Sequence, residues 1–385
     1  MNVYVRNLSR EMGRLGWQVD VFTRRHDPAE PQIRQLGENA RVIHLEAGPC
    51  ELPKDDIYHL LPEFVSNLLR FQEEADLGYD LMHSHYWLSG WVAEELRRRW
   101  GLPHIASFHT LGEVKNRARL GEHETELRIE TEKGVIAGAD QVIAFSPHER
   151  DQIIQLYDGL PSKIKVIPAG VDPGMFQPLD RMEARRKLGI SDSNILLYVG
   201  RIEPLKGLDV LLQAVACLKE RGGLRLLVIG GDGQSDGEVA RLGSLAAELG
   251  IAEVVTFMGT VEHETLPLFY NAADICVVPS YYESFGLVAI EALACGIPVV
   301  ASSVGGLVTT VRDGETGYLI PQHRPEAFAQ RLDWLLSDGE LRRRLGAAAR
   351  ASVARYSWPL IAQQVLDAYR ALAERAQQPD VVSAL

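Results

Sequence analysis

The chain of 385 residues is 46% hydrophobic, which is enough for two domains that each bury a core of their own. Its formal net charge of −12 argues against a general affinity for nucleic acid or for anionic membranes. The four cysteines have no paired short spacing, which predicts a reducing, cytoplasmic setting and no metal site. The sequence shows no charged-then-apolar leader and no apolar run of about 18 residues, so no transmembrane segment is predicted.

The chain opens on a helical pattern. Apolar residues recur every three or four positions from Val5 to Leu15, Gly16 ends the pattern, and residues 19–22 predict a strand. An alternating α/β protein should instead begin with a strand and a glycine-rich turn. A helix in first place is therefore unusual for the fold that the rest of the chain predicts.

Short apolar runs alternate with helical patterns along both halves of the chain and predict two parallel sheets. The further strands predicted in the first half are 42–45, 81–83, 104–108, 141–144 and 164–167. Those in the second half are 195–199, 224–229, 254–257, 275–278 and 299–301. The proline- and glycine-rich segment 168–178 predicts a linker. We expect domains at 1–168 and 169–357, followed at 358–385 by a helix that returns to the first domain and a tail.

Two carboxylates, Glu283 and Glu291, flank the start of a predicted helix at 286–294. The first amides of that helix lack carbonyl partners and carry the positive end of the helix dipole, which suits a diphosphate. Glu291, about a turn further on, can accept hydrogen bonds from a vicinal diol such as a ribose. A surface acid and a capping acid on an ordinary helix remain the alternative if the two glutamates are taken alone.

Two cations, Arg201 and Lys206, follow the first predicted strand of the second half and open a helix. At the carboxyl end of a strand they can neutralise a pyrophosphate, although ordinary helix-entry charge is the alternative. Their place in the same half as the glutamates favours the phosphate interpretation. The turn at 230–233 lacks the G-x-G-x-x-G spacing, so no nicotinamide cofactor is predicted.

Histidines follow two predicted strands of the first half, at the ends where open α/β sheets bind ligands. We interpret His83 and His85 as interior groups. The candidates for a second anion site are Lys54, Lys115 and Arg128. No Asp-x-Asp pair occurs in the sequence, so a metal bridging a diphosphate is not predicted and cationic side chains would take that role.

These residues lie in motifs that resemble the retaining glycosyltransferases of family 4, which have two Rossmann-like domains facing across a cleft (GT-B fold). The chain is similar in particular to D-inositol-3-phosphate glycosyltransferases and bacterial sucrose-phosphate synthases. The similarity runs from Met1 to about Trp358, and its most specific pieces are MNVYV, HSHYWLSG, HTLGEVKN, GRIEPLKG and ESFGLVAIE.

The resemblance implies roles for individual residues. Arg201 and Lys206 would hold the donor diphosphate, Glu291 would bind the ribose, and His109 would approach the donor hexose near the reacting carbon. The residues implied along the sugar and phosphates are Glu283, Ser284, Phe285, Gly286 and Leu287. The residues implied around the acceptor's phosphate are Lys54, Tyr86, Thr110 and Arg128, where the match at Lys54 needs a one-residue gap. Asn2 matches an asparagine near the acceptor ring.

The reaction implied is retaining transfer of a hexosyl group from a nucleotide-diphosphate sugar, with UDP favoured, to a small phosphorylated polyol or sugar. No cofactor or metal is implied, and the chemistry is a same-face attack in which the leaving diphosphate accepts the acceptor's proton. Three alternatives stay open: a lipid-linked or polysaccharide acceptor, a sugar-nucleotide epimerase, and a non-catalytic nucleotide-sugar binder. A homodimer is compatible with the sequence, which fixes neither the oligomeric state nor the hexose.

One departure from the family concerns the first domain. Family members have a strand and a Gly-Gly loop immediately before the equivalent of Met1 and Asn2, and this sequence has neither. That strand is central in the family's first sheet, so we expect its neighbours to expose unpaired backbone. We expect that the start codon of this sequence was placed too late or that the chain is truncated.

Overall fold

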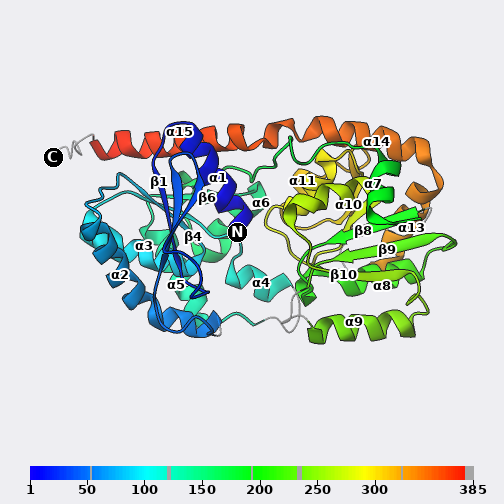
Figure 1. Ribbon diagram of the computed structural model, residues 1–385, viewed down its shortest axis with the longest axis horizontal. Helices are drawn as coiled ribbons and strands as arrows, with labels where there is room; N and C mark the ends of the chain where they lie inside the picture. Colours follow the sequence, from blue (N-terminus) through cyan, green and yellow to red (C-terminus); the bar gives the residue numbers. More distant parts are fainter. Residues whose placement is uncertain (53, 119–122, 192–193, 232–235, 322–323, 378–385) are drawn as a thin grey trace. The chain divides into compact units, whose positions relative to one another are not determined.

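The computed structural model describes residues 1–52, 54–118, 123–191, 194–231, 236–321 and 324–377 (Figure 1). They form two compact units. Unit 1 holds the described residues of Met1–Asn116, His123–Pro168 and Trp358–Leu385, and unit 2 holds those of Arg117–Glu122 and Ala169–Ser357.

The strands before residue 168 lie in two sheets. They are β1 Val19–Arg24, β2 Ile33–Gly37, β3 Ala40–Leu45, β4 Met82–His85, β5 His104–Ser107, β6 Gln141–Ala144 and β7 Ile164–Val166. One sheet has the order β1-β3-β2 with β2 antiparallel, and the other has the parallel order β4-β5-β6-β7. Strand β2 was not predicted, because its side chains are mostly exposed and show no apolar alternation.

Within these sheets β1 bonds only to β3 and β4 bonds only to β5, as far as the structure describes them. All four side chains of β5 are buried, whereas those of β1 are half-buried except Arg24. A parallel strand in the middle of a sheet is normally buried on both faces. Within the described residues, β1 and β4 therefore each lie at the end of their sheet's strand order, with one hydrogen-bonded neighbour.

The helices of unit 1 cover both sheets. They are α1 Asn2–Arg14, α2 Leu61–Glu74, α3 Trp87–Trp100, α4 Gly112–Ala118, α5 Glu126–Gly138, α6 Pro147–Tyr157 and α15 Trp358–Gln377, with the short helices η1 Lys54–Leu60 and η2 Pro161–Lys163. The predicted opening helix is therefore confirmed, and it buries Tyr4, Leu8 and Met12 on one face. Helix α15 packs on α1, where the rings of Tyr4 and Trp358 lie 5.4 Å apart.

Unit 2 is built on one sheet of six parallel strands in the order β10-β9-β8-β11-β12-β13. The strands are β8 Asn194–Val199, β9 Leu224–Ile229, β10 Val255–Gly259, β11 Ile275–Val278, β12 Val299–Ser302 and β13 Gly317–Ile320. This is the Rossmann order, and the direction of winding reverses between β8 and β11. All five strands predicted in the second half are present, and β13 was missed because its first residue is a glycine, which leaves an apolar run of only three residues.

The helices of unit 2 are α7 Arg181–Leu188, α8 Leu208–Ala216, α9 Asp236–Glu248, α10 Leu266–Ala272, α11 Leu287–Ala294, α12 Leu307–Thr310, α13 Pro325–Ser337 and α14 Gly339–Ser352. Short helices are η3 Pro204–Lys206, η4 His263–Thr265 and η5 Ala354–Tyr356. Every residue of β11 and β12 is buried, as expected for parallel strands covered on both faces. None of the described helices in either unit is long and apolar enough to cross a bilayer.

Candidate active site

The predicted donor residues of unit 2 lie at the carboxyl ends of β8 and β11. The loop after β8 carries Arg201 and Lys206, and the loop after β11 carries Glu283. These two strands are neighbours and mark the point where the winding of the sheet reverses. Open α/β sheets bind their ligands at this point, outside the carboxyl ends of the strands.

Lys206 and Glu283 form the ion pair at this point. Nζ of Lys206 lies 2.6 Å from Oε2 of Glu283, and the two side chains remain 20% and 18% exposed. Arg201 is 72% exposed and pairs with Glu203 at 3.0 Å. The structure therefore joins Lys206 to Glu283, while the guanidinium of Arg201 pairs with Glu203 in a largely exposed position.

The start of α11 offers amides to an anion. Gly286 is its N-cap with φ of 92°, a left-handed conformation that favours glycine. The amides of Gly286 and Leu287 have no hydrogen-bond partner among the described residues. Phe285, next to this helix start, is buried and packs edge-on against Tyr356. This is the amide-rich helix start that the sequence predicts, with Ser284 next to it in the same loop.

Two glycines that the sequence analysis passed over hold this loop. A Cβ on Gly305 would meet the carbonyl oxygen of Glu283 at 1.9 Å, and one on Gly306 would meet that of Ser284 at 2.3 Å. The amide of Gly306 donates to the carbonyl of Glu283 at 2.8 Å. Their signal was available as a Gly-Gly pair in the loop that follows a predicted strand.

Glu291 is buried on α11 and already has two partners. The hydroxyl of Tyr270 donates to its Oε2 at 2.9 Å, and Nε2 of His263 lies 3.4 Å from its Oε1. Burial first, and then the charge of Glu291, raises the pKa of Tyr270 well above its usual value, so the phenol stays a donor. A carboxylate can accept about four hydrogen bonds, which leaves capacity for a diol. Sequence periodicity gave no sign of Tyr270 or His263 as partners.

In unit 1 the residues that follow β4 and β5 adopt uncommon backbone conformations. Tyr86 has φ of 84° and His109 has φ of 61°, in the left-handed region that non-glycine residues rarely occupy. Such strain persists where the surroundings over-determine it, which is frequent at functional sites. The amide of Tyr86 donates to the carbonyl of Ser107 at 2.7 Å and ties the two strand ends together.

The histidines at these strand ends form a buried cluster. Nδ1 of His85 lies 3.2 Å from Nε2 of His109, and His83 bonds to the hydroxyls of Tyr369 at 2.6 Å and Ser107 at 3.0 Å. Burial lowers the pKa of His85 to about 3 and places that of His109 well below its usual value. Both rings are therefore neutral near pH 7, and His109 can act as a hydrogen-bonding group and not as a cation.

Arg128 contacts two of the predicted acceptor residues, Thr110 and Tyr86. Its NH2 donates to the carbonyl and hydroxyl oxygens of Thr110 at 2.9 and 3.1 Å, and its guanidinium lies over the ring of Tyr86 at 4.9 Å. Its Nε donates to Glu132 at 2.8 Å. Although burial acts to lower it, the charge of Glu132 and its neighbours raises the pKa of Arg128, which remains a cation.

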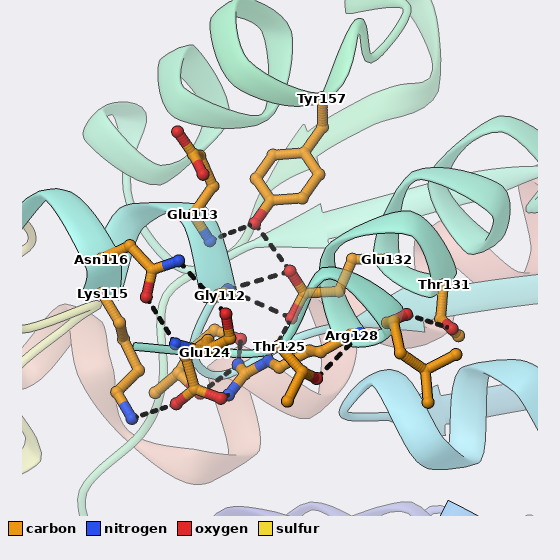
Figure 2. Close-up of polar contacts among 12 residues, drawn as sticks. Gly112, Glu113, Lys115, Asn116, Glu124, Thr125, Arg128, Thr131, Glu132 and Tyr157 are labelled. Atoms are coloured by element: carbon orange, nitrogen blue, oxygen red, sulfur yellow. Dashed lines mark hydrogen bonds and ion pairs between the residues drawn. The ribbon is translucent and has the colours of Figure 1, made fainter. Parts of the chain in front are cut away.

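Glu132 is fully buried and serves as the anchor of this cluster. Its carboxylate accepts hydrogen bonds from the amide of Gly112 at 2.9 Å and from the hydroxyl of Tyr157 at 2.6 Å. Figure 2 shows these partners converging on the one carboxylate from separate elements. Neither Glu132 nor Tyr157 was singled out from the sequence, because their contacts join segments that lie far apart along the chain.

The remaining predicted residues fall outside this cluster or outside the description. Asn2 is exposed at the start of α1, two residues before Tyr4, whose ring packs on His109. The side chain of Lys54 lies outside the described part of the structure, as do residues 232 and 233 of the glycine-rich turn. Among the described residues no group of three or more His, Cys, Asp or Glu side chains is placed to hold a metal ion.

Comparison with known proteins agrees with this geometry. A model for "Glycosyl transferase 4-like domain" matches residues 1–170, and one for "Glycosyl transferases group 1" matches residues 180–352. A D-inositol 3-phosphate glycosyltransferase of Stackebrandtia nassauensis is 42% identical, over 98% of this chain and 88% of the relative. The chain belongs to the group 1 glycosyl transferases. D-inositol 3-phosphate glycosyltransferase 2 of Catenulispora acidiphila is 44% identical, over 96% of this glycosyltransferase and 89% of its own length.

Solved structures agree with the fold. Sucrose-phosphate synthase from Thermosynechococcus elongatus aligns with a TM-score of 0.90 and 39% identity, over 97% of this glycosyltransferase and 94% of that chain. The Anabaena protein HepE, in complex with UDP and glucose, aligns with a TM-score of 0.76 at 20% identity, over 92% and 99% of the two chains, which shows the fold alone. The predicted GT-B fold and the predicted membership of the family are confirmed.

Proposed function

We propose that this glycosyltransferase moves a hexosyl group, with retention of configuration, from a nucleotide-diphosphate sugar to a small phosphorylated polyol or sugar. The observation that carries the proposal is the meeting of Tyr86, Thr110 and Arg128 at the carboxyl ends of β4 and β5. A planar guanidinium beside a hydroxyl is a typical phosphate-binding arrangement. The printed names of the relatives, inositol-phosphate glycosyltransferase and sucrose-phosphate synthase, support an acceptor of this class.

The donor is assigned to unit 2, and a UDP-sugar is favoured. The amides of Gly286 and Leu287, together with Lys206 and Arg201, would bind the diphosphate, and Glu291 would bind the ribose hydroxyls. The HepE complexes with UDP and with UDP-glucose support a uridine donor through their fold only. No metal or further cofactor is part of the proposal, since the cations and helix amides supply the positive charge.

The reaction is written as a same-face displacement. The bond from the anomeric carbon to the diphosphate oxygen breaks, a bond from that carbon to the acceptor oxygen forms on the same face, and the acceptor's proton passes to the departing diphosphate. Lys206 would stabilise the charge that develops on the leaving oxygen, and Glu283 would hold the ammonium in place. Neutral His109 would hydrogen-bond to the hexose near the reacting carbon.

The experiment is a panel of nucleotide sugars, with and without a chelator, against phosphorylated and unphosphorylated acceptors, read by product mass. We expect a product with a UDP-hexose and an inositol or sugar phosphate, in the presence of the chelator. Product only with a lipid-linked or polymeric acceptor would overturn the proposal. Conversion of the donor without acceptor would indicate an epimerase, and donor binding without turnover would indicate a non-catalytic binder.

A further inference from the structure

The candidate acceptor site contains a carboxylate next to the groups assigned to a phosphate. Glu124 lies just before α5, and its side chain lies between two cations (Figure 2). One carboxylate oxygen is 2.8 Å from NH1 of Arg128, and the other pairs with Nζ of Lys115. Asn116 fixes the backbone there, since its Oδ1 accepts from the amide of Glu124 at 2.6 Å. The site thus already binds one anionic group, from its own chain.

The exposed fractions of the side chains indicate which of these contacts a ligand can replace. The side chain of Arg128 is 2% exposed, whereas those of Glu124 and Lys115 are each 20% exposed. The guanidinium edge that faces Glu124 is therefore covered by that carboxylate. Glu132 cannot leave, because it is fully buried and bonded to Gly112 and Tyr157 as well as to Arg128.

The charges in the cluster are balanced without a ligand. Lys115 and Arg128 contribute two positive charges, and Glu124 and Glu132 contribute two negative charges. Although burial acts to raise it, the contacts with Lys115 and Arg128 hold the pKa of Glu124 below its usual value, so the carboxylate is ionised near neutral pH. A phosphate that entered beside Glu124 would meet a like charge in a partly desolvated place. The phosphate would bind more favourably if it displaced the carboxylate of Glu124 from the two cations.

We propose that Glu124 is an internal substitute for the acceptor's phosphate and a determinant of acceptor specificity. The inference rests on the proposed function. A phosphate monoester carries about −1.5 to −2 charges near pH 7 and three acceptor oxygens, so it can displace a single carboxylate from Lys115 and Arg128. A neutral polyol offers no charge to replace that of Glu124. The carboxylate of Glu124 therefore keeps unphosphorylated acceptors from binding to Lys115 and Arg128. It also lowers the affinity for the phosphorylated acceptor, which has to displace it.

The test is calorimetric titration of inorganic phosphate into the full chain, with Glu124→Gln and a matched control. The control is Glu130→Gln, because Glu130 lies on the same helix α5, is 61% exposed, and pairs with Lys133 at 2.8 Å outside the cluster. Glu124→Gln should bind phosphate on the order of tenfold more tightly, since a like charge is removed next to the ligand. Glu130→Gln should bind as the wild type does.

Steady-state activity measurements distinguish a failure of this inference from a failure of the proposed function. Glu124→Gln should lower the KM of the phosphorylated acceptor by a similar factor and leave the KM of the donor unchanged. Phosphate binding that is unchanged or weaker in Glu124→Gln would overturn the inference, because Glu124 would then only position the cations. If Glu124→Gln bound phosphate more tightly but the enzyme transferred only to unphosphorylated acceptors, the proposed function would be refuted. The displacement of Glu124 by phosphate would still be supported. Should the glutamine variant fail to fold, Glu124→Asp, which shortens the side chain, should still bind phosphate more tightly than the wild type.

Discussion

Replacing Arg128 by alanine should lower the stability of unit 1, apart from any effect that it has on acceptor binding. Its partner Glu132 is fully buried and would lose the Nε contact of 2.8 Å, while it kept the hydrogen bonds from Gly112 and Tyr157. Removing one member of a buried ion pair costs about 3–5 kcal/mol. Because two hydrogen bonds to Glu132 remain, we expect a loss of about 3 kcal/mol, at the lower end of that range.

Thermal unfolding followed by calorimetry checks this value. A loss of that size lowers the Tm of a unit of this length by about 6–12 °C. The double variant Arg128→Ala/Glu132→Gln should be less destabilised than the sum of its single variants, since it leaves no buried charge without a counter-ion. The control Arg98→Ala removes a 69% exposed arginine from α3 and should leave the Tm unchanged. A Tm of Arg128→Ala within about 1 °C of the wild type would refute the reasoning.

Three further changes test other parts of the account. Lys206→Ala should lower kcat about 100- to 1,000-fold in steady-state assays, because charge on the leaving group is no longer stabilised, and a kcat within twofold of the wild type would contradict this role. Gly306→Ala places a Cβ 2.3 Å from the carbonyl oxygen of Ser284 and should cost about 1–3 kcal/mol in denaturant unfolding, whereas Gly243→Ala, with open space on α9, should not destabilise. Burial raises the pKa of Glu149 from 4.5 to about 7, so the contribution of its protonated form to stability should be full below pH 4.5 and should be lost, at a cost of about 3 kcal/mol, as the pH rises past 7. Glu149→Gln should flatten that pH dependence, and an unchanged profile would show that Glu149 is not its source.

Much of the fold could be predicted because it depends on local patterns. Strands such as Ile275–Val278 are short, apolar and wholly buried, so their composition alone marks them. The helix start at Gly286 was predictable for the same reason, since a glycine after a polar corner sets a helix boundary. The exposed strand Ile33–Gly37 was missed because it gains its hydrogen bonds from a neighbouring strand and not from any apolar pattern of its own.

The site was predictable only in part, because its contacts join distant segments. The sequence marked Lys206 and Glu283 individually, but not that they pair across 77 positions of the chain. It marked Arg128 and Lys115 as cations, but not that Glu124 lies between them. Buried carboxylates such as Glu132 leave no signal in periodicity, since a glutamate on a helix normally indicates a solvated face.

The central claim is that this glycosyltransferase selects an acceptor for its phosphate. The most direct measurement is the ratio of kcat/KM for one polyol in its phosphorylated and unphosphorylated forms, with the same UDP-sugar and in the presence of a chelator. We expect the phosphorylated form to be preferred by at least about 100-fold, since a charged group held by Arg128 contributes about 3 kcal/mol. A ratio near one, or a preference for the unphosphorylated polyol, would contradict the account.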